Sequence, residues 1–234
     1  MPLMPLILAL ETSSPVCSVA LTLDGALLAA AELRLEKSHS SHLTVLIEQL
    51  LSNAGYGLPQ LSALAVSDGP GSYTGLRIGA AAAKGLCYAL GLPLLAVGTL
   101  PALAHQVARQ VPNAARYRFA PLLDARRMEV YAALYAADGQ ELQAPAPIIL
   151  EADSWAAELA AGPVVFFGSG AAKFQPLVAE NPNAQFLADV QPSAIAVAQL
   201  AEAAFARQEF RDVAYYEPFY LKEVHTTTPK STQS

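Results

Sequence analysis

Charged residues are scarce in this chain of 234 residues: they make up 15% of it, whereas 53% of the residues are hydrophobic. That composition is typical of a well-buried globular protein and argues against extensive disorder away from the ends. Basic residues are in deficit, and the formal net charge is −6. Because phosphate contacts come chiefly from Lys and Arg, we do not expect this chain to be the main surface that grips a nucleic acid, although a basic partner could supply one.

Cysteine is also rare. Cys17 and Cys87 lie in apolar stretches at no metal-like spacing. This pattern predicts two free, buried thiols in a reducing compartment, and hence a cytoplasmic protein.

Long uninterrupted apolar runs are missing as well. The N-terminal segment lacks a basic stretch and reaches Glu11 before a signal-peptide core of normal length. The most apolar window, 78–97, contains Lys84 and is broken at Gly91 and Pro93. We therefore expect neither a signal peptide nor a membrane span.

Strand and helix signals alternate in the first half of the chain. An Asp24-Gly25 turn between two apolar runs predicts a hairpin within a meander of three strands. Apolar residues at helical spacing follow, with Ser40 or Ser41 as the N-cap and Gly55 as the stop. The expected order is β-β-β-α-β-α-β-α, with strands at 6–10, 16–23, 26–35, 61–67 and 94–97 and helices at about 40–54, after the glycine-rich turn near 69–75, and from 99 or 101.

The order repeats in shortened form from Tyr117. A second turn, Asp138-Gly139, separates two strand-like runs, and the expected elements are strands at 119–123, 129–136, 141–150 and 164–167 with helices at 153–161 and 171–179. A duplicated β-β-β-α-β-α unit predicts an α/β protein with two lobes of one architecture facing each other across a cleft. With a last helix from Ser193 returning to the first lobe, we expect a first lobe of 1–108 with 190–222, a smaller second lobe of 109–189 and a flexible polar tail at 223–234.

The stretch from Asp68 to Gly85 is expected to organise the chain, because it joins a buried strand to a helix through a glycine-rich turn. Such a turn at a helix N-terminus could cradle a phosphate. Neither named phosphate motif fits, however. A P-loop ends in Gly-Lys-Ser/Thr, whereas Lys84 lies well inside the helix, and a dinucleotide fingerprint needs glycine where Thr74 stands.

A contact surface is the second interpretation of this stretch. Gly75, Gly79 and Ala83 recur at every fourth position of the expected helix and are too small to hold a neighbouring helix away. The other helix residues are apolar on nearly every face, which predicts burial on more than one side. The small-residue stripe faces either a partner or the chain's own sheet, and the residues alone leave both alternatives open.

Two polar segments near the N-terminus are candidates for chemistry. His39 and His42 could share a helix face as metal ligands, but zinc-peptidase spacing and a nearby acidic ligand are missing, so exposed or capping histidines are favoured. The segment Glu11-Thr12-Ser13 could orient a metal-bound nucleotide and hold a phosphate. An ordinary polar turn is the favoured alternative for that segment.

The densest charge cluster lies in the second half. It comprises Asp124, Arg126, Arg127 and Glu129 beside a turn. An Asp and an Arg there could pair across the cleft or hold an anion. A salt-bridged turn is favoured.

Four motifs, in this order, resemble the TsaB (YeaZ) family: Glu11-Thr12-Ser13, Gly69-Pro-Gly-Ser-Tyr-Thr-Gly-Leu-Arg77, Asp124-Ala-Arg-Arg-Met-Glu-Val-Tyr131 and Pro218-Phe-Tyr-Leu-Lys222. The match spans almost the whole chain, and the glycine-rich motif is highly specific. The resemblance implies the fold of actin, hexokinase and the Hsp70 ATPase, with two lobes that each contain a ribonuclease-H-like sheet.

The resemblance also implies a non-catalytic subunit needed for threonylcarbamoyl transfer to N6 of the position-37 adenosine in tRNAs that read codons starting with adenine. Such a chain binds and supports the larger transferase subunit TsaD, with the ATPase TsaE as a further partner. It is expected to be a homodimer when alone and to reach tRNA through the complex. It requires no cofactor or metal of its own, with ATP or ADP at the partner interface as an open option.

Two enzyme alternatives stay open at this point. The first is an ATP-binding phosphotransferase or ATPase of the same fold, for which the nucleotide-binding candidates are Glu11, Thr12, Ser13 and Asp124. The second is a metallopeptidase that uses the two histidines, His39 and His42.

In this family the helix after the glycine-rich loop and the helix at 42–54 form a bundle with the partner or with a second copy. This favours the partner interpretation of the small-residue stripe. The implied interface residues are His42, Leu46, Gly71, Ser72, Tyr73, Thr74, Gly75, Arg77, Gly79, Ala82 and Ala83.

The chain departs from the family pattern at three points. Glu11 stands where the family usually has Asp, which weakens the case for nucleotide hydrolysis through that position. Lys222 stands where Arg is common, and Lys cannot make the same bidentate contact. His39 and His42 do not reproduce the paired metal histidines of TsaD. All three departures favour an accessory role.

Overall fold

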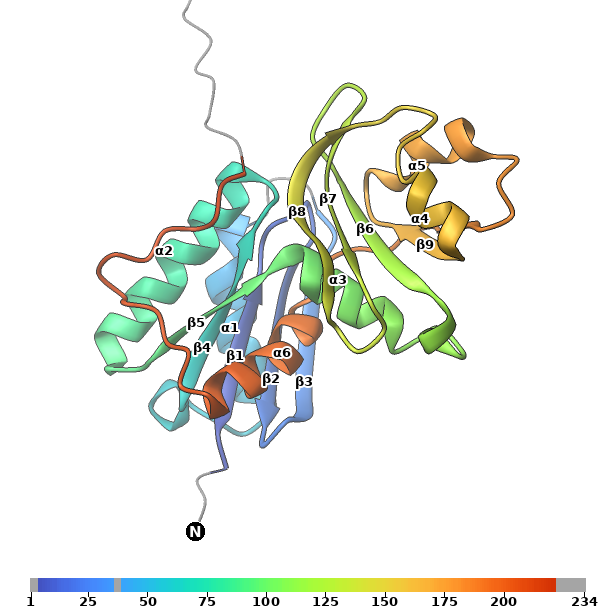
Figure 1. Cartoon of the computed structure of the whole chain (residues 1–234). Coiled ribbons are helices and arrows are strands. Elements are labelled where there is room, and N and C mark those ends of the chain that lie inside the picture. Colours follow the sequence, from blue (N-terminus) through green and yellow to red (C-terminus); the bar gives the residue numbers. More distant parts are fainter. Residues whose placement is uncertain (1–3, 36–38, 222–234) are drawn as a thin grey trace, which may run out of the picture.

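Two five-stranded sheets form the framework of the computed structural model, which describes residues 4–35 and 39–221 (Figure 1). In the first sheet, β1, β2 and β3 form an antiparallel meander, and β4 and β5 run parallel to β1 on its other side. The strand order is β3-β2-β1-β4-β5, and the strands are β1 (Leu6–Glu11), β2 (Cys17–Leu23), β3 (Ala26–Leu33), β4 (Ala63–Gly69) and β5 (Leu94–Gly98).

The second sheet repeats this topology. Strands β6, β7 and β8 form an antiparallel meander, and β9 and β10 run parallel to β6. The order is β8-β7-β6-β9-β10, and the strands are β6 (Arg118–Asp124), β7 (Glu129–Tyr135), β8 (Glu141–Ile149), β9 (Val164–Phe167) and β10 (Ala184–Leu187). The predicted duplication is confirmed.

Helices cover both faces of the first sheet (Figure 1). Helices α1 (His39–Asn53) and α2 (Tyr73–Leu90) pack on one face, and α3 (Thr99–Ala108) and α6 (Ala194–Ala206) pack on the other. Leu8 of β1 points toward α1 and α2, whereas its neighbour Ala9 points toward α6. A strand with both faces covered must be apolar at every position, which explains the unbroken apolar run of β1.

Helix α3 lies between the two sheets. Its Ala102 packs against the first sheet, whereas Leu100, Leu103 and Val107 pack on Phe119 and the rest of the inner face of the second sheet. The strands between 6 and 98 and the returning α6 pack together around the first sheet. The lobe boundaries at 108/109 and 189/190 stay predictions.

The second lobe departs from the predictions in its connections. Helix α4 (Ala156–Ala161) begins after Trp155, whose φ of +58° lies outside the right-handed helical region. Helix α5 (Ala171–Phe174) continues only as the 3-10 turn η3 (Gln175–Val178), and β10 was not predicted. Two further 3-10 turns, η1 (Leu58–Gln60) and η2 (Ala114–Arg116), lie in loops.

Residues 207–221, here called the C-terminal strap, run back along the first lobe beside β5 and α2 (Figure 1). The Arg211 amide donates to the Leu94 carbonyl over 2.8 Å, and Lys84 Nζ donates to the carbonyls of Ala214 and Tyr216 over 3.2 and 2.9 Å. The predicted tail, 223–234, and Lys222 lie outside the described residues. None of the helices in the described part of the chain is long and apolar enough to cross a membrane.

Candidate functional site

The glycine-rich loop between β4 and α2 lies directly on the loop that follows β1. A Cβ atom on Gly71 would collide with Ser13, and one on Gly75 would collide with the Thr12 carbonyl. The Ser72 amide donates to the Ser13 carbonyl over 2.7 Å, and the Gly75 amide donates to Ser72 Oγ over 3.2 Å. The two glycines therefore permit a close packing contact between the loops. The amides of Ser72 and Gly75 are hydrogen-bonded within the chain and are not free to bind a phosphate.

The small-residue stripe of α2 faces inward. Gly75, Gly79 and Ala83 are all buried, and a Cβ atom on Gly79 would collide with the side chain of Thr12. Gly79 and Ala83 therefore pack against the chain's own lobe, whereas Gly75 packs on Thr12 and also lines a cavity described below. This packing agrees with the own-sheet alternative, and the assignment of the three residues to a partner interface stays a prediction.

The other implied interface residues lie nearer the surface. Tyr73 stacks against Tyr220 of the C-terminal strap with ring centroids 5.0 Å apart, and the Arg77 guanidinium lies 5.4 Å from the Tyr73 ring centroid. The exposed members of the set are His42, Ser72, Tyr73, Thr74 and Arg77, and the half-buried members are Leu46, Gly71 and Ala82. Tyr88 is one of the apolar helix residues for which burial on the core or on a partner was predicted, and it is 87% exposed on α2.

Glu11 ends β1 and is completely buried. The Ser13 amide donates to its Oε1 over 2.6 Å, whereas Oε2, Thr12 Oγ1 and Ser13 Oγ are buried without a hydrogen-bond partner among the described residues. Burial raises the pKa of Glu11, and hydrogen bonds from Ser13, Ser67 and Thr12 offset only part of that rise. The carboxyl group of Glu11 is closed off from solvent in this structure.

Asp124 lies at the end of β6 in the second lobe and is exposed. Its Oδ1 accepts hydrogen bonds from Lys173 Nζ over 2.5 Å and from the Arg126 amide over 2.6 Å. Lys173 Nζ also donates to the Arg127 carbonyl over 2.6 Å. The turn thus carries a salt bridge, but its cation is Lys173 of α5 rather than an arginine of the predicted cluster, and no hydrogen bond or ion pair joins Asp124 to Glu11 within the described ranges.

The two histidines of α1 differ in their surroundings. His39 is 7% exposed, and its Nε2 has no hydrogen-bond partner in the described part of the chain. His42 is exposed, and its Nδ1 lies 2.7 Å from Ser41 Oγ. Within residues 4–35 and 39–221, no group of three or more His, Cys, Asp or Glu side chains could hold a metal ion. The structure thus provides no ligand set for the metallopeptidase alternative there.

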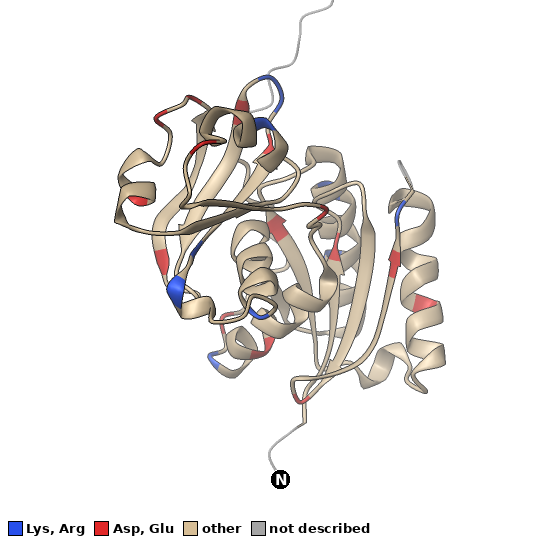
Figure 2. Ribbon diagram, turned by 90° about the vertical axis from the view of Figure 1, so that its right-hand side faces the viewer, with Lys and Arg blue, Asp and Glu red and all other residues tan. Residues whose placement is uncertain are grey.

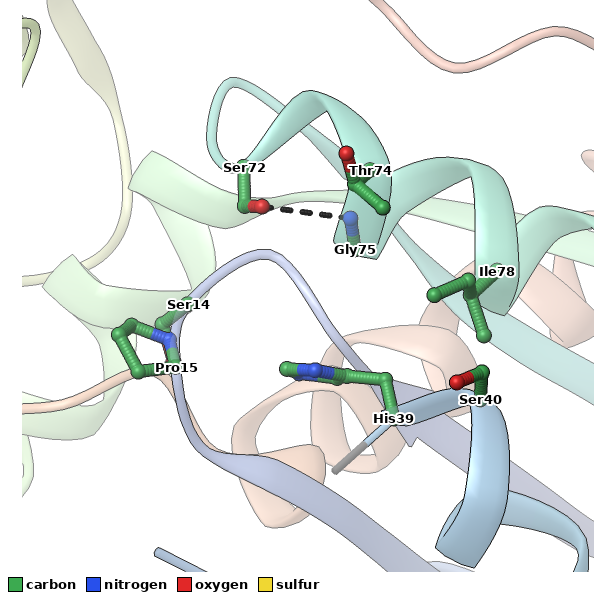
Figure 3. A pocket seen from close by; sticks show the side chains of 8 residues that line it. All are labelled: Ser14, Pro15, His39, Ser40, Ser72, Thr74, Gly75 and Ile78. Atoms are coloured by element: carbon green, nitrogen blue, oxygen red, sulfur yellow. Dashed lines mark hydrogen bonds between the residues drawn. The ribbon is translucent and has the colours of Figure 1, made fainter. Parts of the chain in front are cut away.

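A cavity of about 520 Å³, here called the helix-start pocket, opens where α1 and α2 begin. In Figure 3 the His39 side chain extends across it toward Pro15, with the start of α2 above. The lining residues are Ser14, Pro15, His39, Ser40, Ser72, Thr74, Gly75 and Ile78. Neither Glu11 nor Asp124 is among them, and no signal in the sequence marked Ser14, Pro15, Ser40 or Ile78 as neighbours.

A second cavity of about 470 Å³, here called the α1–α2 groove, lies farther along the same two helices. It is lined by Thr44, Ile47, Glu48, Leu51, Ser52, Tyr56, Gly57, Leu58 and Leu86. Both cavities lie on the first lobe rather than between the lobes.

The comparisons with protein families and solved structures identify the family of this chain. Residues 34–230 match the model of the family described as TsaD: tRNA N6-adenosine threonylcarbamoyltransferase. The structure of YeaZ from Pseudomonas aeruginosa superposes with a TM-score of 0.78 at 33% sequence identity, covering 93% of this chain and 100% of that one. The chain belongs to the TsaB (YeaZ) family.

Curated relatives in this family are named after a biosynthetic pathway. The tRNA threonylcarbamoyladenosine biosynthesis protein TsaB of Haemophilus influenzae is 41% identical over 125 residues, which are 53% of this chain and 51% of that protein. The chain thus spans about half the length of the curated relatives it matches.

More distant structures show the fold alone. Component A of the (R)-2-hydroxyglutaryl-CoA dehydratase of Acidaminococcus fermentans superposes with a TM-score of 0.52 at 9% identity, covering 88% of this chain and 99% of that one. The two-lobed fold of the actin, hexokinase and Hsp70 ATPase group, which the resemblance implied, is confirmed.

Proposed function

We propose that this chain is a non-catalytic subunit required for threonylcarbamoyl transfer to N6 of the position-37 adenosine of tRNA, and that it acts by binding and supporting a TsaD transferase subunit. Membership of the TsaB family supports the pathway. The observation that carries the non-catalytic role is the complete burial of Glu11, whose neighbours Thr12 and Ser13 pack against Gly75 and Gly71 of the glycine-rich loop. The residues that would have held a metal-bound nucleotide are closed off or, like Asp124, engaged elsewhere.

The surface formed by α1 and α2 supports a protein partner. It carries exposed Tyr73, Arg77 and Tyr88, and the largely apolar α1–α2 groove lies on the same two helices. Tyrosine and arginine side chains are enriched at the residues that dominate binding energy in protein interfaces. We assign this face to TsaD in the complex and to a second copy of the chain when TsaD is absent, with TsaE as a further partner.

Transfer RNA is expected to bind through the complex rather than through this chain. In the view of Figure 2 the Lys and Arg residues of the described part are scattered singly or in small groups among acidic ones. Together with the net charge of −6, this distribution offers little counterion release to a phosphate backbone. A cytoplasmic location accords with this role and stays a prediction.

A nucleotide is not part of this proposal for the isolated chain. The residues Glu11, Thr12 and Ser13 do not fit a metal-bound nucleotide, because all three are buried and their loop is covered by Gly71 and Gly75. ATP or ADP at the interface with TsaD is compatible with the proposal and is not required by it.

The test is a reconstituted transfer assay with the proteins and tRNA of one organism, omitting each subunit in turn. Product should vanish without this chain, and this chain alone should make none. Binding to TsaD should weaken about tenfold or more in Arg77→Glu, because the charge of an exposed interface residue is reversed. It should be unchanged in Arg109→Glu, because Arg109 is an exposed residue that directly follows α3, away from this face. Undiminished transfer without the chain would refute the accessory role, and ATP turnover by the chain alone, lost in Glu11→Ala, would establish the ATPase alternative.

A further inference from the structure

The helix-start pocket combines the N-termini of two helices. Helix α1 begins at His39, and α2 begins at Tyr73 with Ser72 as its N-cap. Both starts line the same cavity, which contains His39 and Ser40 from one helix and Thr74 from the other. The backbone N–H groups of a helix start carry partial positive charge, so two starts at one cavity favour an anionic group.

A buried and unpartnered imidazole gives this pocket a second, independent reason to hold a ligand. His39 is 7% exposed, and its Nε2 has no hydrogen-bond partner among the described residues. Its side chain extends across the cavity toward Pro15 (Figure 3). Because nearly all buried polar atoms in folded proteins are hydrogen-bonded, an imidazole left unpaired beside a cavity indicates a group that arrives from outside.

The side chains that line the pocket indicate which chemical class of group binds there. Ser40 and Thr74 supply exposed hydroxyl donors, and the hydroxyl of Ser72 can donate while its oxygen accepts from the Gly75 amide. The described lining residues include no carboxylate that would repel an anion and no Lys or Arg of the kind that proteins use to hold phosphate groups. Pro15 and Ile78 add apolar walls that suit a methylene stem.

We propose that the helix-start pocket receives the carboxylate of an Asp or Glu side chain from the protein partner. This proposal rests on the proposed function, because it specifies a contact within that interface. The pocket and the expected partner surface share Ser72 and Thr74, both exposed on the first turn of α2. A partner lying along α1 and α2 would therefore bring its side chains to the mouth of this pocket.

Charge at the pocket mouth provides the decisive test. Thr74→Asp and Ser40→Asp each place a carboxylate at an exposed helix start, where a negative charge favours the helix, so neither variant should unfold the chain. Each should weaken the binding of TsaD from the same organism about tenfold or more in calorimetric titration, through repulsion of the incoming acid. Thr74→Asn and Ser40→Asn have nearly the same shape without the charge and should bind within about threefold of the wild-type chain.

A probe of the isolated chain tests the ligand class. Sodium acetate, titrated at constant ionic strength, should shift the backbone amide resonances of Thr74 and Gly75 saturably in the wild-type chain and should not do so in Thr74→Asp. Sodium phosphate should not give saturable shifts. Saturable shifts with phosphate but not with acetate would overturn the carboxylate assignment.

The outcomes separate this proposal from the broader one. If the wild-type chain does not bind TsaD, both proposals fall. If the wild-type chain binds and the two Asp variants bind as tightly as their Asn counterparts, only the acidic side chain in the helix-start pocket is refuted.

Discussion

The Tyr216 hydroxyl donates a hydrogen bond of 2.9 Å to Asp68 Oδ1, and this bond joins the C-terminal strap to the end of β4, directly before the glycine-rich loop. The Phe219 amide reinforces this link by donating to the Asp68 carbonyl over 2.7 Å. A Cβ atom on Gly69 would lie 2.6 Å from the Phe219 carbonyl, so only glycine permits the strap to approach this closely. The strap thus contacts the start of the loop at Asp68 and Gly69, whereas Gly71 and Gly75 pack on Ser13 and Thr12.

Tyr216→Phe should destabilise the chain because it leaves the partly buried Asp68 carboxylate without its hydroxyl donor. A hydrogen bond to a charged group of this kind contributes about 1.5–3 kcal/mol to the free energy of unfolding. Urea denaturation at neutral pH measures the loss. Tyr215→Phe is the matched control, because Tyr215 is 85% exposed, and it should change the midpoint little. Equal midpoints for both variants would contradict the role given to this hydrogen bond.

Two glycines on α2 should respond in opposite directions to the same substitution. Gly79→Ala forces a Cβ atom into the buried side chain of Thr12 and should cost about 1–3 kcal/mol of unfolding free energy. Gly85→Ala meets nothing within 4 Å and should stabilise the helix by about 0.5–1 kcal/mol. Thermal denaturation of the two variants compares them directly. Destabilisation by Gly85→Ala, or tolerance of Gly79→Ala, would show that the packing of α2 differs from that described here.

Both cysteines should resist thiol reagents in the folded chain. Burial raises the pKa of Cys17 and that of Cys87 to about 11, and the nearby Glu11 adds to the rise for Cys17. At a pH of about 8 only about one thousandth of each thiol is ionised, and both side chains are covered. A disulfide-exchange reagent should therefore titrate no thiol in the native chain and both in concentrated guanidinium chloride. Rapid labelling of the native chain would indicate frequent local opening of the first lobe.

Most of the fold could be predicted because its signals are local. The Asp24-Gly25 and Asp138-Gly139 turns marked both hairpins, and apolar periodicity marked the long helices. Strand β10 (Ala184–Leu187) was missed because it is a four-residue edge strand, half-buried or exposed at every position. A strand this short carries too few residues to show a period.

The site was harder to predict because its geometry depends on segments far apart in the chain. Small residues at every fourth position allow another segment to pack closely on one face of α2, but the sequence does not tell which segment packs there. In the structure it is Thr12, in the loop after β1. The contacts of Gly71 with Ser13 and of Gly75 with Thr12 have the same origin, since they join segments about 60 residues apart in the chain. His39 was weighed as a metal ligand, whereas its place in a pocket depends on the start of α2.

Glu11 should make the stability of the chain fall as the pH rises. Its folded-state pKa lies above the ordinary value of 4.5 because burial disfavours the charged carboxylate. Below a pH of about 4.5 the carboxyl is protonated in both the folded and the unfolded state, and its contribution to stability is fully present. Between that pH and the raised folded-state pKa the unfolded chain releases its proton first. The contribution is therefore lost as the pH rises through the folded-state value, with a slope of at most about 1.4 kcal/mol per pH unit.

Glu11→Gln removes this dependence while keeping the oxygen that accepts the Ser13 amide. The new amide can also donate to Thr12 Oγ1 or Ser13 Oγ, which are buried without partners among the described residues. Urea unfolding of the variant and the wild-type chain across the pH range should give similar midpoints in acid and a rising advantage for the variant toward alkaline pH. A variant whose disadvantage grows as the pH rises would mean that the carboxylate is charged and stabilising in the folded state. In that case Glu11 has a stabilising partner beyond the Ser13 amide, which would return it to the candidates for chemistry.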